Sequence, residues 1–264
     1  MDPLDDFTRF DFWHDGYTKR VYRKGDGPPV IVIHEMPGIT PEVARFGRRV
    51  ADNGFTVFMP SLFGTDGKKP RSKLDYLPSF AQVCISRQFA LFTENRSGPV
   101  VDWLRALARM VHAEIGGRGV GVVGMCLTGN FALTMAVDPE VMAPVLAQPS
   151  LPLCELPLCG KLGPAVNASP ETLKAVRERH EADGIKVIGL RFDGDTKCPP
   201  ERFKTLDREL GPAFEPHELK DSSARTGKAN PHSVLTTELI DEEGELTRAA
   251  LDRVLGYFEE RLKG

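Results

Sequence analysis

The stretch that decides the fold is residues 119–133, GVGVVGMCLTGNFAL. An apolar run ends in a cysteine that stands close to two glycines, Gly124 and Gly129, and the chain then takes up a helical apolar pattern. This is the layout of a nucleophile elbow, a sharp strand-to-helix turn that raises a reactive side chain above a sheet. Cys126 occupies the position of the nucleophile. Unpaired N–H groups at the start of the following helix would favour its thiolate form.

A second interpretation is open, because a free cysteine after a core strand is often a small buried hydrophobic residue. The segments that follow favour the reactive interpretation. Residues 185–192 form a strand-like run that ends just before Asp195, and residues 214–220 form the last expected strand, ahead of a loop to His232. Both side chains would then lie beside Cys126, at the carboxyl ends of the parallel strands, where open α/β sheets bind ligands.

Strand and helix patterns alternate along the rest of the chain. Further strands are expected at residues 7–12, 17–23, 30–34, 55–59 and 141–147, and helices at 41–53, 100–111, 169–184, 199–210 and 245–262. This alternation predicts an α/β fold with a mostly parallel sheet and helices on both faces. We expect a single domain over residues 1–264, in which the long connection at 148–168 is a cap or a mobile loop.

Composition and charge exclude several classes of partner. The net charge of -3 gives no reason to expect nucleic acid or an anionic membrane. No stretch approaches the ~18 consecutive apolar residues of a membrane span, and the acidic N-terminus does not resemble a signal peptide. The five cysteines fit reduced thiols in a cytoplasmic enzyme. Cys154 and Cys159 have no matching pair of zinc ligands, so we expect no metal and no other cofactor.

Four segments together resemble the dienelactone hydrolase family, the cysteine branch of the α/β hydrolases. They are HEMPG at 34–38, GMCL at 124–127, DTKCP at 195–199 and HS at 232–233. The resemblance implies an α/β-hydrolase fold and a carboxylic ester or lactone hydrolase of the carboxymethylenebutenolidase class, acting on a small molecule. One departure is Thr128, because the family usually has glycine two residues after the nucleophile. We expect this β-branched residue to tighten the elbow.

The residue types predict a mechanism. Cys126 would attack the carbonyl carbon and form a thioester acyl-enzyme that water later hydrolyses. His232 would take the thiol proton and afterwards activate water, while Asp195 holds the imidazole. The oxyanion would rest on the backbone N–H groups of Met36 and Leu127.

Each of these assignments has a structural alternative. His232 could be a residue at a helix start that bonds a nearby carbonyl, and either Asp195 or Asp193 could be a turn residue or a helix N-cap. We prefer Asp195 as the acid because it matches the family's Asp-x-x-x-Pro placement. His34, at the end of a buried strand, is expected to be a packed core histidine.

Glu35 and Arg87 depend more on the resemblance. A carboxylate directly after a buried strand is costly unless it is paired, and a salt bridge at the strand end would satisfy it. The resemblance implies instead that Glu35 contacts the resting thiol and helps to form the thiolate. It also implies arginines that hold a substrate carboxylate. Arg87 lies in the corresponding stretch, although an ordinary surface cation explains it equally well, and the second such position is Thr236.

Three classes of function are therefore open. The first is a hydrolase of small, dienelactone-like esters or lactones. The second is a non-catalytic ligand-binding relative on the same fold. The third is a thiol redox protein, which the lack of a resolving cysteine near Cys126 disfavours. The presence of Cys126, Asp195 and His232 together favours the hydrolase.

Overall fold

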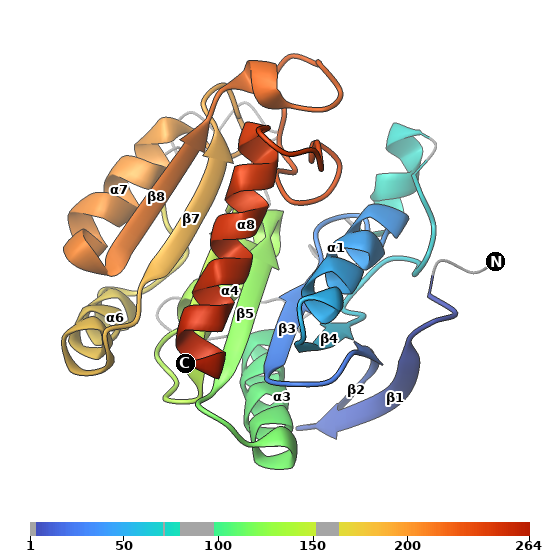
Figure 1. Cartoon of the computed structure of the whole chain (residues 1–264), viewed down its shortest axis with the longest axis vertical. Helices are drawn as coiled ribbons and strands as arrows, with labels where there is room; N and C mark the ends of the chain where they lie inside the picture. Colours follow the sequence, from blue (N-terminus) through green and yellow to red (C-terminus); the bar gives the residue numbers. More distant parts are fainter. Residues whose placement is uncertain (1–3, 71, 80–97, 152–163) are drawn as a thin grey trace.

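The computed structural model describes residues 4–70, 72–79, 98–151 and 164–264. Its strands are β1 Thr8–His14, β2 Tyr17–Lys24, β3 Pro29–Ile33, β4 Thr56–Pro60, β5 Val120–Met125, β6 Val141–Ala147, β7 Val187–Phe192 and β8 Phe214–Leu219. They form one sheet in the order β1-β2-β4-β3-β5-β6-β7-β8 (Figure 1). The pairs β1–β2 and β2–β4 are antiparallel, and every pair from β4 to β8 is parallel. The expected mostly parallel sheet is confirmed.

The strands differ in burial as their sequences indicate. All residues of β3 and β5 are buried, which suits continuous apolar strands covered on both faces. By contrast, β1 alternates between exposed and half-buried positions at the edge of the sheet. The hairpin between β1 and β2 turns at Asp15 and Gly16, whose φ angles are 46° and 80°. Two successive positive φ angles match the twist of a tight hairpin.

Helices cover both faces of the sheet. They are α1 Pro41–Asp52, α3 Pro99–Ile115, α4 Gly129–Met135, α6 Pro170–Asp183, α7 Pro200–Leu210 and α8 Leu246–Phe258. Helices α1 and α8 pack on one face, and α3, α4, α6 and α7 pack on the other (Figure 1). None of the helices in the described ranges is long and apolar enough to cross a bilayer.

Helix ends largely follow the sequence signals. Ser169 Oγ accepts a hydrogen bond from the Thr172 N–H at 3.2 Å, and Gly184 closes α6 in the left-handed conformation. The last helix differs from the expectation of one α-helix at 245–262. It changes at Glu259–Lys263 to a wider π-type turn, from which Lys263 reaches the Asn53 carbonyl.

The long connection expected at 148–168 is only partly described. Residues 152–163 lie outside the described ranges. Residues 148–151 leave β6 directly, and the side chains of Gln148 and Ser150 are buried there. This segment starts at the same edge of the sheet as the chain that follows β3, β5 and β7, because these strands are all parallel.

Candidate active site

Cys126 stands in a strained turn directly after β5. Its φ angle is 56°, a backbone conformation that residues other than glycine rarely adopt. The turn requires glycine at position 124, because a Cβ there would lie 2.1 Å from the Thr128 carbonyl oxygen. Strain of this kind is concentrated at functional sites, where the surrounding structure holds it. The tight strand-to-helix turn predicted for residues 119–133 is therefore present.

Thr128 closes this turn with hydrogen bonds of its own. Its hydroxyl accepts from the Met125 N–H at 2.9 Å and lies 2.9 Å from the Ile33 carbonyl, to which it can donate. The side chain is fully buried, and its backbone has ordinary helical angles. Thr128 thus connects the ends of β5 and β3, at the position where the resemblance led us to expect glycine.

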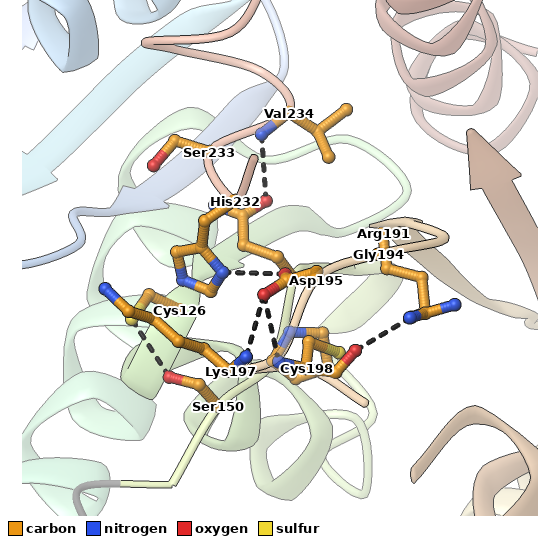
Figure 2. Close-up of polar contacts among 12 residues, drawn as sticks. Cys126, Ser150, Arg191, Gly194, Asp195, Lys197, Cys198, His232, Ser233 and Val234 are labelled. Carbon is orange, nitrogen blue, oxygen red and sulfur yellow. Dashed lines mark hydrogen bonds and ion pairs between the residues drawn. The ribbon is translucent and has the colours of Figure 1, made fainter. Parts of the chain in front are cut away.

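Asp195 and His232 are paired at the same edge of the sheet. His232 Nδ1 donates to Asp195 Oδ2 at 2.7 Å (Figure 2). Asp195 is 1% exposed, and its other oxygen accepts the backbone N–H groups of Lys197 at 2.9 Å and Cys198 at 3.2 Å. The carboxylate is therefore fixed from both sides and sets the orientation of the ring. The second nitrogen, His232 Nε2, is buried without a hydrogen-bond partner in the described part of the chain.

Asp193, the alternative acid, lies elsewhere. It is exposed, its carboxylate forms an ion pair with Lys220 at 3.0 Å, and it accepts the Asp221 N–H at 3.0 Å. Of the two aspartates after β7, Asp195 is the one that the structure brings to His232.

The charges of the site support one another. Burial alone would raise the pKa of the Cys126 thiol, but the nearby His232 and, to a smaller extent, the Ser150 hydrogen bond outweigh it and lower the pKa below its ordinary value. Burial alone would lower the pKa of His232, but the charges of Asp195 and Cys126 raise it to about 10. Both pKa directions favour a thiolate at Cys126 beside a protonated His232.

Ser150 is a site residue that the sequence reasoning missed. Its hydroxyl lies 2.9 Å from Cys126 Sγ, and Figure 2 shows Cys126 between His232 and Ser150. No motif marks it, but its position could have indicated it. Ser150 comes three residues after the end of β6, at the edge that carries the other site residues.

Glu35 follows β3 and is buried among neutral donors. Its Oε2 accepts from Ser233 Oγ at 2.7 Å and Gln148 Nε2 at 3.3 Å, and its Oε1 accepts from Thr236 Oγ1 at 2.5 Å. The expected contact with the thiol of Cys126 is not among the hydrogen bonds of the described residues. The physical reason is that the loop carrying His232 supplies two hydroxyl groups that occupy the carboxylate.

Gln148, the other missed residue, joins the same cluster. Its φ angle is 38°, an unusual conformation for glutamine. Its side-chain oxygen accepts the Val234 N–H at 3.3 Å, while its side-chain nitrogen donates to Glu35. The segments after β3, β6 and β8 are thereby tied together beside His232.

His34 is a packed neutral histidine, as expected. Its Nε2 accepts the Leu62 N–H at 3.0 Å, and burial lowers its pKa to about 4.

The other predicted residues are the two oxyanion donors and Arg87. Met36 and Leu127 directly follow Glu35 and Cys126 in the chain, so their N–H groups lie at the same edge of the sheet. Arg87 lies outside the described residues. Within the described ranges, no group of three or more His, Cys, Asp or Glu side chains could hold a metal ion.

Comparison with solved structures identifies the architecture. The chain is similar to a protein provisionally named dienelactone hydrolase from Klebsiella pneumoniae subsp. pneumoniae MGH 78578, with 17% identity, 96% of this chain and 98% of that chain covered, and a TM-score of 0.62. It is also similar to a soluble variant of the monoglyceride lipase of Saccharomyces cerevisiae, with 12% identity, 99% of each chain covered and a TM-score of 0.59. A third similar structure is a cold-adapted esterase from an Arctic intertidal metagenomic library, with 16% identity, coverage of 96% and 92%, and a TM-score of 0.54. At these identities the likeness shows the α/β-hydrolase fold.

Comparison of the sequence identifies the family. No curated protein matches the chain. The model of the dienelactone hydrolase family matches residues 15–167, which is more than half of the chain and includes Glu35 and Cys126. The protein therefore belongs to the dienelactone hydrolase family and has its α/β-hydrolase fold.

Proposed function

We propose that this member of the family hydrolyses small esters or lactones through a cysteine nucleophile. The observation that carries the proposal is the strained backbone of Cys126, at φ 56°, beside a His232–Asp195 pair joined at 2.7 Å. A strained backbone at the cysteine, near a buried imidazole nitrogen that no described residue hydrogen-bonds, supports a catalytic role over a role in packing.

In this mechanism Cys126 Sγ attacks the carbonyl carbon of the substrate as a thiolate and forms a thioester. The oxyanion is stabilised by the backbone N–H groups of Leu127 and Met36. The proton on His232 Nε2 passes to the leaving oxygen, and the freed nitrogen then takes a proton from the water that attacks the thioester. Asp195 keeps the ring in the tautomer that these transfers require.

Glu35 has two roles in this proposal. Through its hydrogen bonds to Ser233 and Thr236 it holds the loop that carries His232. Through its charge it opposes the thiolate, because a nearby anion raises the pKa of Cys126. Substrates of the dienelactone type are part of the proposal, as is a cytoplasmic location, where a thiol nucleophile stays reduced.

The test is hydrolysis of p-nitrophenyl acetate with and without prior treatment with iodoacetamide. The proposal expects turnover that alkylation abolishes, loss of turnover in Cys126→Ala, and normal turnover in Cys84→Ala. A ligand-binding relative would show no turnover in the untreated protein. A redox protein would consume peroxide through Cys126 without cleaving the ester. A screen of lactones and short esters would then define the substrate.

A further inference from the structure

The hydroxyl of Ser150 is held directly against the sulfur of Cys126. Oγ and Sγ lie 2.9 Å apart, and the hydroxyl has no other hydrogen-bond partner among the residues described. The elbow itself fixes the backbone of Ser150. Its N–H donates to the Cys126 carbonyl at 3.0 Å, and its carbonyl accepts from Asn130 Nδ2 at 2.7 Å. The main chain of Ser150 is therefore held beside Cys126 by residues of the elbow itself.

A buried guanidinium anchors the same segment. Arg202 in α7 has no exposed surface. Its Nη1 donates to the carbonyls of Pro149 at 2.8 Å and Lys197 at 2.9 Å. It thus links the residue before Ser150 to the loop that carries Asp195. A buried cation is costly without such acceptors, so this anchoring is a built part of the site.

The direction of the hydrogen bond follows from the charge on the sulfur. A thiolate has no proton, so only the hydroxyl can donate. Ser150 is 4% exposed, which limits competition from water and strengthens a hydrogen bond to an ion. Among the described residues, the titratable groups of the site besides Asp195 include His232, Glu35, Cys198 and Lys197, which lies in the loop that carries Asp195. His232 favours the thiolate and Glu35 opposes it, while burial raises the pKa of Cys198 and keeps that thiol neutral.

We propose that Ser150 is a catalytic residue whose hydroxyl donates a hydrogen bond to the sulfur of Cys126 and stabilises it as an anion. The group acts twice in the reaction. Before attack it holds the thiolate. During hydrolysis of the thioester the water oxygen bonds to the carbonyl carbon and its proton passes to His232. The C–S bond then breaks, and its electron pair returns to a sulfur that Ser150 stabilises. The proposal deepens the proposed function and rests on Cys126 as its nucleophile.

The test is the pH dependence of alkylation of Cys126 by iodoacetamide, followed by mass spectrometry of the peptide that contains it. Thiolate absorbance in the ultraviolet gives a second readout. Ser150→Ala should raise the midpoint pH by about one unit, because a hydrogen bond to an ion contributes about that much to the difference between the protonation states. At a fixed pH below the midpoint, alkylation should slow by somewhat less than about tenfold, since the more basic thiolate is also more nucleophilic.

Two further comparisons separate the effect of the hydroxyl from effects on stability and shape. Ser169→Ala removes the N-cap of α6, so it changes stability without touching the site and should leave the midpoint unchanged. Ser150→Thr and Ser150→Val have nearly the same shape and differ in the hydroxyl. If Ser150→Ala does not fold, these two variants show whether the hydroxyl lowers the pKa of Cys126. The threonine variant should keep the midpoint closer to that of the native protein than the valine variant does.

Equal midpoints in the native protein and Ser150→Ala, or in the threonine and valine variants, would overturn the proposal. The midpoint is measured without an ester, so its outcome is separate from that of the proposed function. If the protein hydrolyses esters but Ser150→Ala shows no shift in the midpoint, Cys126 remains the proposed nucleophile and the role of Ser150 is contradicted. A protein that shows the shift in Ser150→Ala but hydrolyses no ester would keep this role for Ser150 and contradict the proposed function.

Discussion

Thr236 Oγ1 donates to Glu35 Oε1 at 2.5 Å and so joins the loop that carries His232 to the end of β3. Ser233, the residue after His232, donates to the other oxygen of the same carboxylate at 2.7 Å. Glu35 is thus a buried anion held by neutral donors that flank the histidine. A carboxylate in this setting orders the loop and also places a negative charge near the thiol of Cys126.

Glu35→Gln should therefore have two opposed effects. Ester turnover should fall, because the loop carrying His232 loses charge-assisted hydrogen bonds. Alkylation of Cys126 by iodoacetamide in the absence of substrate should become faster, since removing a nearby anion lowers the pKa of the thiol. Both rates are measured on one preparation. A variant that turns over slowly but is no more reactive toward iodoacetamide would reduce Glu35 to a purely structural residue.

Thr236→Val tests the loop without changing any charge. Loss of one hydrogen bond to a buried carboxylate should lower kcat by roughly tenfold, because such bonds contribute about 1.5–3 kcal/mol and the loop retains its bond from Ser233. The neighbouring Thr237→Val, which removes no contact with Glu35, is the matched control. Steady-state kinetics of both variants on p-nitrophenyl acetate give the comparison, and equal rates would argue against a positioning role for Thr236.

Asp195→Asn should lower kcat by about 10³-fold or more, because loss of the orienting carboxylate favours the wrong imidazole tautomer. Asp193→Asn should have a mild effect, since Asp193 pairs with Lys220 on the surface. Thermal unfolding of both variants separates catalytic loss from instability. The reverse ranking of the two kcat values would show that the acid has been assigned to the wrong aspartate.

The pH profile of the thiol should depend on His232. The cationic ring lowers the pKa of Cys126, and the raised pKa of His232, about 10, keeps the ring charged through neutral pH. Alkylation of Cys126 should thus be efficient at pH values below the ordinary thiol range. In His232→Gln burial acts without the opposing cation, so the midpoint should move to higher pH. An unchanged profile would mean that the ring does not stabilise the thiolate.

The sequence predicted the fold well because its signals are local. Continuous apolar runs marked β3 and β5, and the rule that parallel strands end at one edge brought Cys126, Asp195 and His232 together. The choice of Asp195 over Asp193 as the acid came from the spacing of a family motif and stays a prediction, although Asp195 is the aspartate that pairs with His232 at 2.7 Å.

The partners of these residues were not predictable in the same way. Ser150 and Gln148 carry no motif, and only the register of β6 brings them to the site. Glu35 takes its donors from residues about 200 positions later in the chain, and local pattern does not indicate which of several hydroxyl groups reaches a carboxylate. Arg87, which the sequence left open between a substrate contact and an ordinary surface cation, lies outside the described residues.

The most direct test of the central claim is to trap the acyl-enzyme. The protein is mixed with p-nitrophenyl acetate, quenched in acid during turnover, digested and mapped by mass spectrometry. The account predicts one acetyl group on Cys126, which accumulates and decays at the rates of turnover and is missing in Cys126→Ala. An acetyl group on another residue such as Ser150, together with undiminished turnover in Cys126→Ala, would contradict it.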